Sequence, residues 1–167
     1  MVTEMSNFRA LRNVPVLITI LVAFTLMIVP LPTSVESFRP DWLTLVLIFW
    51  AMTVPRSYSV GIAWLLGIVL DATQGTILGQ HALALCVIVY VTVKFHLLMR
   101  VFPLSQLTAT VFALLALYQF LLFWINGVAG VSAPAVDYWG PVVSGTLIWP
   151  IVSTFLSGMR YRVQTGI

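Results

Sequence analysis

Charge is scarce in this chain. Charged residues make up 8% of its 167 residues, against roughly 25% in an ordinary soluble domain. The formal net charge is +3, but the Lys and Arg residues total only 8 and form no patch. A nucleic-acid partner is therefore excluded, because such proteins carry a basic soluble surface.

Groups for catalysis or metal binding are equally sparse. Cys86 is the single cysteine, so the chain can form neither an intrachain disulfide nor a cysteine metal site. The five acidic residues are scattered, which argues against a metal-dependent transferase. No serine-protease signature is present, and the spacing of Gly67, Gly75 and Gly79 fits no phosphate-binding loop. We therefore expect no enzyme, no cofactor and no metal site.

Apolar residues are abundant instead. They make up 60% of the chain, and the mean hydropathy is +1.05. Several uncharged runs reach the roughly 20 residues that a helix needs to cross a bilayer. We predict an all-α membrane protein with a single six-helix transmembrane domain over 14–160, a short cytoplasmic segment 1–13 and a cytoplasmic tail 161–167. The predicted spans are 14–32, 41–55, 58–73, 80–100, 103–126 and 137–159.

Arg56 decides between six spans and five. It separates two uncharged runs that are each short for a span, so it lies either in a tight turn or in the middle of one kinked helix. With six spans and both termini inside, only Arg39 of the eight basic residues is outside, whereas five spans place most of them outside. The positive-inside rule therefore favours six spans, N-in/C-in.

The stretch from Gly67 to Leu83 joins the third and fourth predicted spans. Gly67, Asp71, Gly75 and Gly79 are four residues apart, which on a continuous helix would form one closely approachable face. Glycines also end helices, and we favour a break near 73–79. The small residues can accept a partner's transmembrane helix or a neighbouring span of the same bundle, and both alternatives remain open.

Asp71 is the best functional candidate, because intramembrane ionisable groups are costly and are normally paired. It either faces His81 or Arg39, or it closes the third helix at the interface and is hydrated. His81 has no second ligand at metal spacing, which favours a packing or capping role. Before the second span, Pro40 and Asp41 suit a helix start, and Trp42 suits the outer headgroup level.

Two motifs carry a resemblance to a known family. Arg39-Pro40-Asp41-Trp42 and the Gly67–Leu83 stretch resemble the rod shape-determining MreD family. The resemblance implies a bacterial cytoplasmic (inner) membrane protein of the wall elongation machinery. Its partners would be MreC, the glycosyltransferase RodA, a class B penicillin-binding transpeptidase and MreB filaments. It also implies a fold similar to the substrate-binding (S) subunits of energy-coupling-factor transporters, with an outward-facing pocket.

These expectations define a candidate site without catalytic residues, at a partner-binding surface or pocket rim on the outer side. The alternative function is a small-molecule-binding subunit of a transporter. Lys94, His96 and Arg100 form a small cytoplasmic cluster that suits contact with anionic membrane lipids. The candidate site residues are Arg39, Pro40, Asp41, Trp42, Gly67, Asp71, Gly75, Gly79 and His81.

Overall fold

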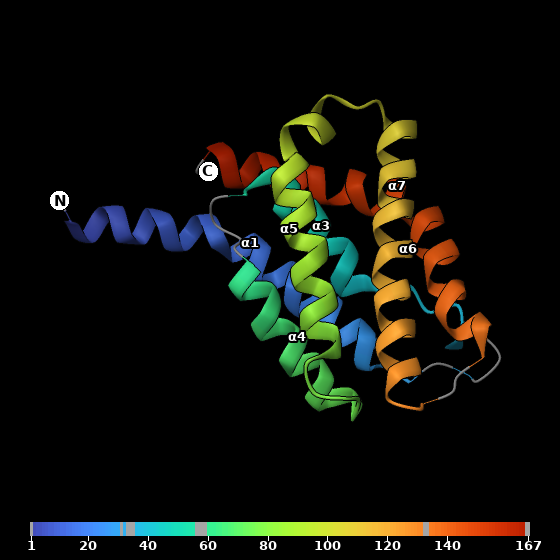
Figure 1. Cartoon of the computed structure of the whole chain (residues 1–167). Coiled ribbons are helices and arrows are strands. Elements are labelled where there is room, and N and C mark those ends of the chain that lie inside the picture. The colour runs from blue at the N-terminus through green and yellow to red at the C-terminus, as the bar shows by residue number, and fades with distance from the viewer. Residues whose placement is uncertain (1, 31, 33–35, 56–59, 132–133, 166–167) are drawn as a thin grey trace.

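The described part of the chain is all-helical, as predicted. The computed structural model describes residues 2–30, 32, 36–55, 60–131 and 134–165. Three helical segments are long and apolar enough to cross a membrane: Gln80–Val101, Leu104–Val128 and Asp137–Met159. The helices are α1 (Val2–Ile28), α3 (Trp42–Thr53), α4 (Val60–Gln74), α5 (Gln80–Val101), α6 (Leu104–Val128) and α7 (Ala135–Thr165) (Figure 1).

Three further apolar segments are short for a span. Val14–Ile28, Trp42–Thr53 and Val60–Gln74 have between 10 and 17 residues. A helix of 12 residues, such as α3, is about 18 Å long, against a hydrocarbon core of about 30 Å. The number of crossings therefore stays a prediction, and Arg56, which sets its parity, lies outside the described residues.

Helix α3 lies at the centre of the bundle. Every residue of it after Trp42 is buried, and the helix contacts α1, α5 and α7. The buried Trp50 donates a hydrogen bond from its indole N–H to the hydroxyl of Thr19 in α1, at 2.9 Å. A helix that is apolar all round belongs in a protein core or in a membrane. Its short length is tolerable because protein covers it on all sides.

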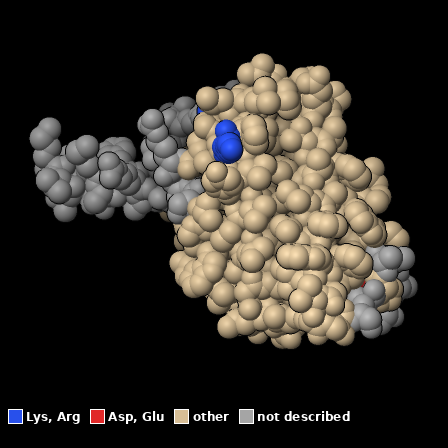
Figure 2. All heavy atoms as spheres, in the orientation of Figure 1, with Lys and Arg blue, Asp and Glu red and all other residues tan. Residues whose placement is uncertain are grey.

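The outer surface suits a lipid environment. Large apolar side chains on α5 and α7 are exposed, including Leu97 at 68%, Leu147 at 73% and Ile151 at 71%. The face drawn in Figure 2 carries almost no charged side chain among the described residues. A soluble domain rarely exposes so large an apolar patch. The chain is a membrane protein.

Hydrogen bonds between helix ends define two ends of the bundle. At the Asp71 end, α4 finishes beside the start of α5, and Asn126 of α6 donates to the Tyr138 hydroxyl of α7. At the opposite end, called the Arg100 end, Arg100 of α5 reaches the last carbonyls of α3. Helices that follow one another in the chain thus run in opposite directions between these two ends.

The first and last helices differ from the predicted spans. Helix α1 begins at Val2 and ends at Ile28, shorter at its C-terminus than the predicted 14–32, because Pro30 disfavours helix in the residue before it. Helix α7 continues to Thr165. A helix can extend past a membrane because its backbone groups bond within the helix and water satisfies those left over at its end.

Candidate functional site

Asp71 organises the join between α4 and α5. Its side chain is wholly buried, and its carboxylate accepts four hydrogen bonds. The donors are the Thr76 hydroxyl at 3.0 Å, the Gly79 N–H at 2.8 Å, the His81 N–H at 3.1 Å and His81 Nδ1 at 2.7 Å. Two of these are backbone donors at the start of α5, which have no partner inside that helix. Asp71 thus caps the following helix from the preceding one.

The predicted break is confirmed. Helix α4 ends at Gln74 and α5 begins at Gln80. Gly75 has φ +65° and Gly79 has φ +98°, and both values lie in the left-handed region that side chains other than glycine rarely adopt. These two glycines form the ends of a tight loop, which we call the 75–79 loop. They do not belong to a continuous helical face.

Gly67 permits close helix approach, but the approaching helix belongs to this chain. A Cβ added there would lie 2.2 Å from the Ala82 Cα and 2.5 Å from the Ala82 nitrogen in α5. By contrast, a Cβ at Gly75 or Gly79 would meet no atom within 4 Å. Of the two alternatives for Gly67, the structure shows the neighbouring span.

Arg39 serves a different helix from Asp71. Its guanidinium donates to the carbonyls of Met27 and Val29 at the end of α1. Cations stabilise helix C-termini because the last carbonyls lack partners and carry partial negative charge. Asp71 therefore pairs with His81, the first of its two predicted partners, and not with Arg39.

Asp41 and Trp42 are where the sequence places them, at the start of α3. Asp41 immediately precedes the helix, but its side chain makes no capping hydrogen bond. It is buried and accepts a hydrogen bond of 2.5 Å from the side-chain amide of Gln119 in α6. Pro40 and Trp42 on either side are half-buried. The Asp41 side chain thus ties α3 to α6.

A buried polar cluster surrounds His81. The Gln80 amide lies 3.4 Å from His81 Nδ1, and the Tyr118 ring centroid is 6.3 Å from that of His81. Both Gln80 Oε1 and the Tyr118 hydroxyl are buried without a hydrogen-bond partner among the described residues. Sequence reasoning missed Tyr118. Its position beside Gln119 inside an apolar run was the available signal.

The geometry at His81 does not match a nucleophilic triad. In a triad, the carboxylate binds one ring nitrogen of the histidine and the nucleophile binds the other. Here the Thr76 hydroxyl lies 3.4 Å from Nδ1, the nitrogen already bonded to Asp71. The described residues include no group of three metal-ligating side chains. The cluster holds the 75–79 loop in place and presents no recognisable catalytic arrangement.

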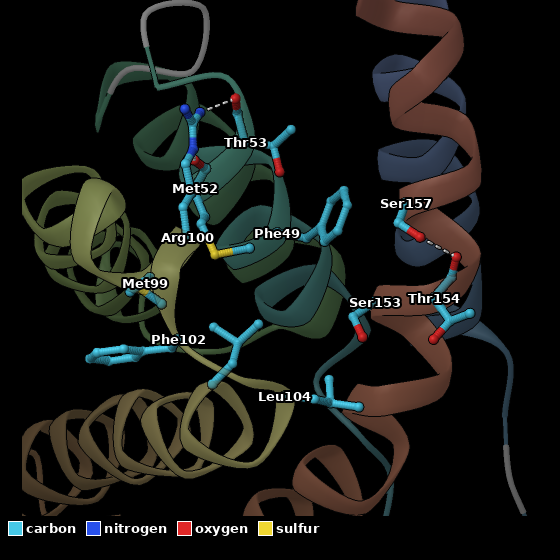
Figure 3. Close-up of a pocket in the computed structure, with 11 residues that line it drawn as sticks. Phe49, Met52, Thr53, Met99, Arg100, Phe102, Leu104, Ser153, Thr154 and Ser157 are labelled. Carbon is cyan, nitrogen blue, oxygen red and sulfur yellow. Dashed lines mark hydrogen bonds between the residues drawn. The ribbon is translucent and has the colours of Figure 1, made fainter.

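A pocket lies at the Arg100 end of the bundle. The pocket mouth that the resemblance implied near Asp71, His81 and the Arg39–Trp42 motif stays a prediction. The structure places a cavity of about 340 Å³ at the Arg100 end, between α3, α5, α6 and α7 (Figure 3). At the Asp71 end, the predicted site residues are engaged largely in holding helices together.

Comparison with known proteins places the chain in a family. The family model described as rod shape-determining protein MreD matches residues 9–159. The chain is 31% identical over 147 residues to a rod shape-determining protein MreD of Haemophilus influenzae, covering 86% of this chain and 88% of the relative. No solved structure matches. The chain belongs to the MreD family of rod shape-determining proteins.

Proposed function

We propose that this protein is a non-enzymatic integral component of the bacterial wall elongation machinery. It binds MreC and so helps to regulate lateral peptidoglycan synthesis and cell shape. Family membership supports a role in rod shape determination. The proposed binding of MreC is supported by the 75–79 loop. Asp71 holds this loop by hydrogen bonds, and the loop exposes apolar side chains.

The loop and the start of α5 offer an apolar docking surface. Leu78 is 69% exposed and Ile77 is 38% exposed, and Leu83 at the start of α5 is 50% exposed. An ordered loop loses little conformational entropy when a partner binds, because Asp71 has already fixed its backbone. The transmembrane helix of MreC would pack at this end of the bundle, over Leu78 and Leu83. Gly67 is covered by α5 and takes part only indirectly.

The remaining partners are assigned through MreC. RodA and a class B penicillin-binding transpeptidase would join the complex directly or through MreC, and MreB filaments would join on the cytoplasmic side. The arrangement in the cytoplasmic membrane is six spans, N-in/C-in, similar to the S subunits of energy-coupling-factor transporters. The positive-inside rule supports this orientation, with the 75–79 loop outside and Arg100 inside.

Truncating Leu78 tests partner binding. Leu78→Ala is expected to lower the amount of MreC recovered with the purified protein by about 5- to 10-fold, as for loss of an interface anchor worth somewhat more than 1 kcal/mol. The measurement is co-purification from membranes in mild detergent. Leu97→Ala is the matched control, because Leu97 is equally exposed, at 68%, but lies near the Arg100 end. Equal recovery of MreC with both variants would refute docking at the 75–79 loop.

Cysteine labelling tests the orientation. The test variants are made in a Cys86→Ser background. Ala129→Cys, just after the end of α6, is expected to react with a membrane-impermeant maleimide on spheroplasts. A cysteine at Gln106, in the first turn of α6, is expected to react only after the membrane is opened. Both positions are exposed. The reverse pattern would place the 75–79 loop in the cytoplasm and remove the proposed MreC surface.

A further inference from the structure

The pocket at the Arg100 end has an apolar wall. Its volume of about 340 Å³ lies at the lower end of the range for ligand sites, about 300–1,000 Å³. Phe49 and Met52 of α3, Met99 of α5 and Leu107 of α6 line it. Figure 3 shows Phe49 and Met52 on the side formed by α3. Such walls suit a hydrocarbon chain and offer nothing to a fully polar solute.

Arg100 provides a positive charge at the rim. Its Nε donates to the Met52 carbonyl at 2.9 Å, and a terminal nitrogen donates to the Thr53 carbonyl. These bonds fix the guanidinium but use only two of its five N–H donors. Arg100 is exposed and has no acidic partner among the described side chains, where the salt bridge found is His81 with Asp71. The remaining donors can therefore bind an anion.

Hydroxyl groups line the opposite side of the pocket. Ser153, Thr154 and Ser157 lie on α7, across from Arg100 in Figure 3. Each donates to a carbonyl of its own helix, at 3.0, 2.7 and 2.7 Å respectively. Their donor hydrogens are thus used, whereas oxygen lone pairs remain to accept. A ligand that hydrogen-bonds to these oxygens must therefore carry hydroxyl donors of its own.

We propose that this pocket binds an anionic phospholipid with a hydroxylated head group, of the phosphatidylglycerol class. Arg100 binds the phosphate, the α7 hydroxyls accept hydrogen bonds from the head group, and an acyl chain lies against Phe49, Met52 and Leu107. Basic pockets between membrane helices bind anionic head groups in this way, and a membrane protein meets such lipids at high local concentration. The site goes beyond partner docking at the 75–79 loop and is independent of it.

Native mass spectrometry of the full chain tests the proposal. The protein is released from mixed micelles containing dioleoyl phosphatidylglycerol or dioleoyl phosphatidylcholine, which have the same acyl chains. One phosphatidylglycerol is expected to remain bound per chain, at an occupancy at least 5-fold above phosphatidylcholine. Arg100→Gln is expected to abolish this preference. Lys94 belongs to the same sequence cluster as Arg100 but does not line the pocket, so Lys94→Gln removes a charge that can attract anionic lipids only in general and is expected to preserve the preference.

A second variant separates binding from folding, because Arg100 also caps α3. Leu107→Trp fills the pocket and leaves Arg100 intact, so it is expected to lower phosphatidylglycerol retention at least 5-fold without lowering the melting temperature. Equal retention of the two lipids by the wild-type protein would overturn the proposal. An equal loss with Lys94→Gln, or displacement of the lipid by millimolar glycerol 1-phosphate, would overturn it too, since these outcomes indicate general charge attraction or a soluble phosphate ligand.

Discussion

Asp71→Ala is expected to lower the free energy of unfolding by about 3–5 kcal/mol, the range for breaking a buried pair by removing one partner. The carboxylate is wholly buried and accepts four hydrogen bonds. Alanine would remove the acceptor of the Gly79 N–H, the His81 N–H and the His81 ring. Each unsatisfied buried donor costs about 1–3 kcal/mol. The measurement is the unfolding midpoint of the purified protein in detergent.

Two variants control for this loss. Asp137→Ala removes an exposed carboxylate that accepts one hydrogen bond, from the Ser37 hydroxyl at 2.7 Å, and is expected to cost less than about 1 kcal/mol. Asp71→Asn keeps the side-chain shape and one oxygen acceptor, so it is expected to fall between wild type and Asp71→Ala. A stability loss for Asp71→Ala no larger than that for Asp137→Ala would contradict the capping role.

Gly67→Ala is expected to lower the free energy of unfolding by about 3 kcal/mol, at the upper end of the usual range for overpacking. The added methyl would lie 2.2 Å from the Ala82 Cα and 2.9 Å from the His81 carbonyl carbon. These are backbone atoms, so relief requires α4 and α5 to move apart. That movement would also stretch the Asp71–His81 hydrogen bond. Thermal unfolding in detergent measures the effect.

Gly158→Ala is the matched control for Gly67→Ala. Gly158 also lies in a helix, α7, but a Cβ there would meet no atom within 4 Å. Alanine is favoured over glycine in a helix by about 1 kcal/mol, so this variant is expected to be neutral or slightly stabilised. A similar loss of stability at both positions would show that the close approach at Gly67 does not govern packing.

The candidate site could be predicted from sequence only in part. The break at the 75–79 loop was predictable, because Gly75 and Gly79 act on the local backbone whatever surrounds them. The choice of His81 over Arg39 as the partner of Asp71 was not predictable, because sequence separation alone does not show which of the two residues lies beside Asp71 in the fold. The role of Gly67 was also undecided, because a small residue looks the same whether it faces its own bundle or a partner. Tyr118 was missed because its burial beside His81 requires the packing of α5 against α6.

The sequence by itself determined that this is an all-helical membrane protein, and where most of its helices begin and end. Apolar run length and the positions of glycine and proline act over a few residues, so they are readable without a structure. Only the tertiary structure decided that α3 is enclosed and that Asp71 caps α5. It also decided that the described pocket opens beside Arg100. These features depend on which helices become neighbours, and contacts such as Ser37 with Asp137 join residues 100 positions apart.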